Sequence, residues 1–95
     1  MAEIKFFRIK ITVESVAGEC ALGHEPGKEF VTEGTTPEGI CLTAFNTLNP
    51  AIQTLMFGGS FPWEEDPNVT SLCCSDHVNR TVFKVEKAGE LVIKE

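Results

Sequence analysis

The segment from Gly18 to Gly27 concentrates groups that can do chemistry. Within it Cys20 and His24 lie four residues apart, among glycines that let the backbone turn sharply. A thiolate and an imidazole both bind soft or borderline metals, and both can take part in acid–base or thiol chemistry. This loop is therefore the first place to look for a functional site.

Two cysteines further along the chain could complete a metal site. Cys41 lies about one turn into an expected helix, and Cys74 lies at the end of an expected strand. A loop, a helix N-terminus and a strand end can converge at one edge of a small domain, where three thiolates and one imidazole would satisfy tetrahedral zinc or a comparable ferrous site. The adjacent Cys73 points to the opposite face of an extended strand. The predicted metal ligands are Cys20, His24, Cys41 and Cys74.

Two other interpretations of the same residues stay open. Free cysteine often packs as a small hydrophobe, and Cys41 lies on the apolar stripe of its expected helix. A thiol-dependent enzyme would use Cys20 as the nucleophile and His24 as its base. A C-x-x-C pair would favour a structural zinc site or a redox thiol, and the sequence contains no such pair. No residue pattern identifies a general base for a metal-dependent enzyme, so the sequence does not favour catalysis.

An aromatic loop offers a different kind of site. The segment Phe61-Pro62-Trp63 is stiff, so it either covers the core or gives a protein partner an anchor. The alternative function is therefore a metal-free interaction module, expected to form a homodimer through this loop. The carboxylates of Glu64-Glu65-Asp66 are typical of a solvated loop.

The elements that position these residues begin with a long strand. From Ile4 to Val16 polar residues alternate with apolar ones at Phe7, Ile9, Ile11 and Val13, which predicts a strand with one face on the core. Similar patterns predict strands over residues 28–32, 69–74, 80–86 and 91–93, the last two separated by a turn at 88–89.

One helix is expected between the second and third strands. Thr36 is the predicted N-cap and Pro37 the first helical residue, and apolar residues then recur at steps of three and four as far as Met56. Pro50 predicts a kink or break, which gives two helical pieces over 37–48 and 50–57. The expected fold is a single α+β domain over residues 1–95, with a mostly antiparallel four- to five-stranded sheet and a kinked or broken helix (about 37–57) on one face.

Composition excludes some partners. The chain of 95 residues has a formal net charge of −6 and eight scattered Lys and Arg residues, so it lacks the basic patch that nucleic acid or an anionic membrane surface requires. No apolar run approaches the length of a membrane span, and the N-terminus does not resemble a signal peptide. These features predict a cytoplasmic protein, in which cysteines stay reduced.

The spaced motifs resemble a family of small uncharacterised prokaryotic proteins of about this length. They are Gly18-x-Cys20-x-x-Gly23-His24-x-x-Gly27, Thr36-Pro37-Glu38-Gly39-Ile40-Cys41, Phe57-Gly58-Gly59, Phe61-Pro62-Trp63-Glu64 and Cys74-x-Asp76. The chain departs from the pattern at Leu42 and Ser75, where proline is more typical. The resemblance implies no reaction, but it implies that the four predicted ligands belong together. The expected function is a small cytoplasmic binding or structural module that holds zinc, or less readily iron.

Overall fold

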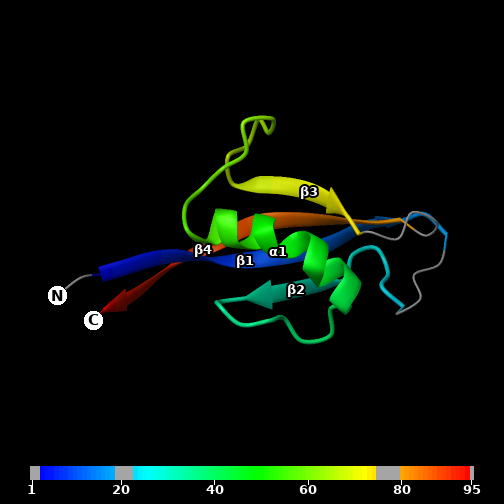
Figure 1. Ribbon diagram of the computed structural model, residues 1–95, viewed down its shortest axis with the longest axis horizontal. Helices are drawn as coiled ribbons and strands as arrows, with labels where there is room; N and C mark the ends of the chain where they lie inside the picture. Colours follow the sequence, from blue (N-terminus) through cyan, green and yellow to red (C-terminus); the bar gives the residue numbers. More distant parts are fainter. Residues whose placement is uncertain (1–2, 19–22, 75–79, 95) are drawn as a thin grey trace.

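The residues that the structure describes form four strands and one helix. The computed structural model describes residues 3–18, 23–74 and 80–94 (Figure 1). The elements in chain order are β1 (Glu3–Val16), β2 (Glu29–Thr32), α1 (Leu42–Met56), β3 (Val69–Cys73) and β4 (Thr81–Lys94).

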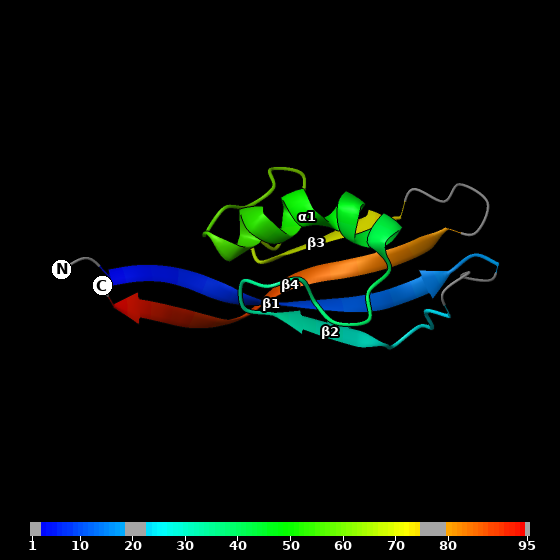
Figure 2. The same ribbon diagram turned by 60° about the horizontal axis from the view of Figure 1, so that its bottom comes forward.

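The strands form one sheet in the order β2-β1-β4-β3, and every neighbouring pair is antiparallel. Helix α1 lies across one face of this sheet, and the central strands β1 and β4 extend past it toward the chain termini (Figure 2). The predicted α+β class and the helix-on-sheet arrangement are therefore confirmed.

The core lies between α1 and the sheet. Every second residue of β1 from Ile9 to Val13 is buried, as the alternation predicts, and these side chains meet Phe83 and Val85 of β4. From the helix, the buried side chains are Ala44, Leu48, Ala51, Ile52, Leu55 and Met56. Near the start of β1, however, Phe6 is buried and Phe7 only half-buried, contrary to the expected alternation.

The turn predicted at residues 88–89 is wrong, because β4 continues as one strand. Phe7 pairs with Glu90 and Ile9 pairs with Lys87, so two residues of β4 face Arg8 alone. This is a β-bulge, and its second residue is Gly89 with a φ of 137°. A bulge bends and twists a strand without ending it, so the Ala-Gly pair that suggested a hairpin lengthens the sheet instead.

The predicted start of the helix is also wrong. Residues 36–40 are not helical and contain a turn at 38–39, in which Gly39 has a φ of 87° and lies against the ring of Phe30. A residue in the left-handed region cannot belong to a right-handed helix. The helix therefore begins at Leu42, and its N-cap is Cys41 instead of Thr36.

Pro50 does not divide the helix into two pieces, since α1 is continuous through it. A proline inside a helix removes one backbone hydrogen bond and costs about 3 kcal/mol relative to alanine. The buried side chains of Leu48, Ile52 and Leu55, on either side of the proline, offset this cost because each contributes about 1.5–3 kcal/mol on burial.

The face of the sheet away from α1 carries a network of opposite charges. Lys10 of β1 pairs with Glu29 on β2 at 3.4 Å and with Glu86 on β4 at 3.4 Å, and Arg8 pairs with Glu33 at 3.0 Å. These half-exposed pairs contribute little to stability individually, but they leave this face polar and balanced in charge.

Candidate functional site

Among the described histidine and cysteine residues, His24 is the most deeply buried. Its ring makes edge contacts with Phe30 of β2 and Phe83 of β4, at centroid distances of 5.5 and 5.9 Å, and the residue is 3% exposed. The loop that precedes β2 therefore folds its imidazole inward under the start of α1, instead of presenting it to solvent.

A hydrogen bond joins His24 to Cys41, which lies 17 residues away along the chain. The backbone N–H of Cys41 donates to Nε2 of His24 at 3.2 Å, so Nε2 carries no proton and the neutral ring carries its proton on Nδ1. Burial lowers the pKa of His24, and the positive charge of Lys28 lowers it further. Within the described chain, Nδ1 is buried without a hydrogen-bond partner.

Cys41 and Cys74 share one feature, which is a backbone N–H directed at the sulfur. Sγ of Cys41 accepts from Ala44 at 3.3 Å, in the manner of an N-cap side chain, and Sγ of Cys74 accepts from Thr81 at 3.4 Å. Both half-buried cysteines pack against the core, and the start of α1 and the end of β3 lie toward the same end of the sheet (Figure 1).

The four predicted ligands therefore differ in how closely the structure places them to one another. It brings His24 and Cys41 into direct contact, and it places Cys74 toward the same end of the sheet, bonded to Thr81. Cys20 lies outside the described residues. Among the residues that are described, no three His, Cys, Asp or Glu side chains are close enough together to hold a metal ion.

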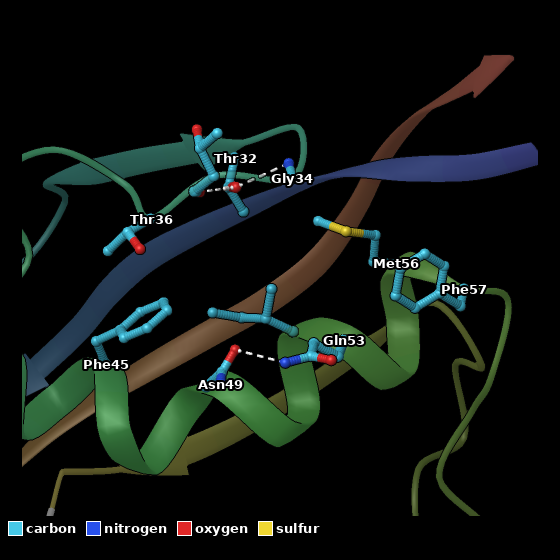
Figure 3. Close-up of a pocket in the computed structure, with 10 residues that line it drawn as sticks. Thr32, Gly34, Thr36, Phe45, Asn49, Gln53, Met56 and Phe57 are labelled. Atoms are coloured by element: carbon cyan, nitrogen blue, oxygen red, sulfur yellow. Dashed lines mark hydrogen bonds between the residues drawn. The ribbon is translucent and has the colours of Figure 1, made fainter. Parts of the chain in front are cut away.

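The structure also contains a cleft between α1 and the segment that follows β2. Its volume is about 420 Å³, and it is lined by Thr32, Gly34, Thr35, Thr36, Phe45, Asn49, Ile52, Gln53, Met56 and Phe57. In Figure 3 the helix side chains Phe45 and Met56, and Phe57 just after the helix, face Thr32 and Thr36 across this space. The volume lies within the range of small-molecule sites.

One wall of the cleft is shaped by a threonine turn. The buried hydroxyl of Thr32 donates to the carbonyl of Thr35 and accepts from the N–H of Gly34 at 3.2 Å. The opposite wall carries two amides one helical turn apart, and Nε2 of Gln53 donates to Oδ1 of Asn49 at 3.1 Å (Figure 3). Sequence reasoning missed this site, although the i, i+4 spacing of the two amides beside an apolar stripe is a signal for it.

The aromatic loop is half anchored and half exposed. Phe61 packs against the core, and the ring of Trp63 lies over it at a centroid distance of 4.9 Å while remaining 68% exposed. The loop therefore covers the core with one ring and presents the other to solvent. Phe57, at the end of α1, is also 65% exposed.

Comparison with protein-family models, curated proteins and solved structures finds no match for this chain. Within the described residues, α1 is too short and too polar to cross a membrane.

Proposed function

We propose that the protein is a small cytoplasmic binding module that holds a transition metal, zinc before iron, through Cys20, His24, Cys41 and Cys74. The observation that carries this proposal is the environment of the two described sulfurs, since Cys41 and Cys74 each accept a backbone N–H. Outer hydrogen bonds of this kind orient and stabilise metal-bound thiolates.

The position of His24 supports the same proposal. Its imidazole contacts Cys41, is neutral because burial lowers its pKa, and leaves one buried ring nitrogen without a partner in the described chain. A neutral imidazole is the form that binds metal. Metal binding through Nε2 would require the ring to release the N–H of Cys41. Binding through Nδ1 would require the ring proton to move from Nδ1 to Nε2, which would also release that N–H.

Metal content and thiol reactivity test the proposal. We expect protein purified without added zinc to contain close to one equivalent of metal, and chelation to release reactive thiols and lower the melting temperature. Cys41→Ser and Cys74→Ser should each lower the metal content, while Cys73→Ser is the matched control and should not. If the wild type neither retains zinc nor binds added zinc or cobalt, the proposal is wrong.

A second candidate function rests on Trp63. A tryptophan that packs on Phe61 but stays exposed is a suitable anchor for a second copy of the chain. Sedimentation over a range of concentrations tests this, because Trp63→Ala should weaken a wild-type dimer. A wild type that remains monomeric at every concentration excludes it. The thiol-dependent enzyme with Cys20 and His24 stays a prediction, which the pH dependence of Cys20 alkylation would test.

A further inference from the structure

The cleft between α1 and the segment after β2 has a lining that selects among ligands. Among the described lining residues, Phe45, Ile52, Met56 and Phe57 are apolar, and the others supply hydroxyl, amide and backbone groups. None of the ten lining residues is charged. Glu33, which lies between the lining residues Thr32 and Gly34 in the chain, is paired with Arg8 at 3.0 Å. Because burying an unpaired charge is costly, this lining favours uncharged molecules.

The two amides of the lining supply a specific hydrogen-bonding pattern. One bond joins Gln53 to Asn49 at 3.1 Å, which uses one donor and one acceptor. Each amide has a carbonyl oxygen and two N–H donors, so the pair still offers one acceptor, the carbonyl of Gln53, and N–H donors on both residues. If the oxygen and nitrogen of both amides are exchanged, one carbonyl oxygen and N–H donors on both residues again remain. An amide group on a ligand has both an acceptor and a donor, so it complements these groups.

The walls of the cleft are held in place before any ligand binds. Ile52 and Met56 are 3% and 5% exposed, so packing against the core fixes these two apolar side chains. The opposite wall is held by the two hydrogen bonds of the Thr32 hydroxyl. Phe57 lies at the end of the helix, is 65% exposed, and can cover the apolar body of a bound molecule. A preformed site loses less conformational entropy on binding.

We infer that this cleft is a binding site for an uncharged small molecule with a flat apolar body and an amide-type edge. The apolar body lies on Phe45, Ile52 and Met56, and the amide group hydrogen-bonds to the free polar groups of Asn49 and Gln53. This site is separate from the described metal ligands His24, Cys41 and Cys74, which do not line the cleft.

Three related probes test the inference by two-dimensional amide NMR. Benzamide has the required ring and amide, benzoate replaces the amide with a charge, and N,N-dimethylbenzamide lacks the amide N–H. We expect benzamide to shift the side-chain amide signals of Asn49 and Gln53 saturably. Benzoate and the dimethyl compound should bind at least about tenfold more weakly. Equal affinity for benzamide and benzoate would overturn the inference, as would an absence of saturable shifts at the two amides.

Two variants localise the binding. Thr36→Trp fills the cleft from an exposed position, and its matched control Thr43→Trp adds the same side chain to an exposed position on α1 outside it. We expect Thr36→Trp to weaken benzamide binding at least about tenfold and Thr43→Trp to leave it unchanged. If Thr36→Trp does not fold, Gln53→Leu replaces it, since Gln53 is exposed and leucine favours helices. Unchanged binding in a folded cleft variant refutes the site.

Discussion

Replacing Pro50 by alanine should stabilise the protein. Pro50 is the ninth residue of the 15-residue helix α1, and its ring is exposed, so the substitution removes little packing. Alanine restores an N–H that can donate to the carbonyl of Asn46, one turn earlier. It also removes the contact of the proline ring with the preceding turn.

The size of the effect follows from two opposing contributions. An interior proline costs about 3 kcal/mol relative to alanine. Proline also restricts the unfolded chain, which returns about 0.4–1 kcal/mol of stability that Pro50→Ala would lose. We therefore expect the free energy of unfolding to rise by about 2 kcal/mol. For a domain of this size, that raises the melting temperature by roughly 10 °C.

Urea unfolding followed by circular dichroism measures this change. Pro67→Ala is the matched control, because Pro67 is exposed in the loop between α1 and β3 and substitutes for no helical hydrogen bond. This control should lose about 0.4–1 kcal/mol through the unfolded state alone. A Pro50→Ala variant no more stable than the wild type would refute the reasoning, since it would show that α1 is built around the proline.

Three further predictions concern the buried site and the core, and each is measured by chemical unfolding of metal-free protein. Burial lowers the pKa of His24, so protonation of this residue destabilises the folded state. The free energy of unfolding should therefore be independent of His24 protonation above about pH 6.5, and below that pH it should fall by at most about 1.4 kcal/mol per pH unit. His24→Gln should remove this pH dependence, and the control His77→Gln should retain it. If both variants keep the same slope of unfolding free energy against pH, groups other than His24 cause the dependence. Cys41→Ala should lose about 0.5–1 kcal/mol through the missing N-cap acceptor, whereas Cys41→Ser should retain that stability; equal losses would contradict a capping role. Leu48→Ala, at a fully buried position, should cost about 2–5 kcal/mol, and a loss below about 1 kcal/mol would contradict the packing of α1.

Local patterns were sufficient to predict the architecture. The alternation over β1 and the helical spacing of apolar residues in α1 each reflect which face is buried, and a residue's neighbours in sequence report this directly. The predicted secondary structure was wrong where the same residues are compatible with two local backbone conformations. Ala88-Gly89 fits a turn and a bulge equally well, and the pairing of β4 with β1, which is distant in the sequence, decided for the bulge opposite Arg8.

The candidate site could be predicted only in part. Cysteine and histidine can be recognised as possible ligands from their chemistry, but the contact between His24 and Cys41 spans 17 residues and depends on two loops folding over the same end of the sheet. The cleft was not predicted, because its walls come from the turn after β2 and from the middle of α1. Such a space exists only after α1 has packed on the sheet.

The sequence alone determined the fold class, the buried face of each main element and the chemical groups available to a site. Tertiary structure decided where α1 begins, that β4 runs on past Gly89, and that the imidazole of His24 is buried and accepts the N–H of Cys41. The division has a physical reason. Periodicity is a property of consecutive residues, whereas a bulge, a distant cap or a cleft depends on the relative positions of elements that are far apart in the chain.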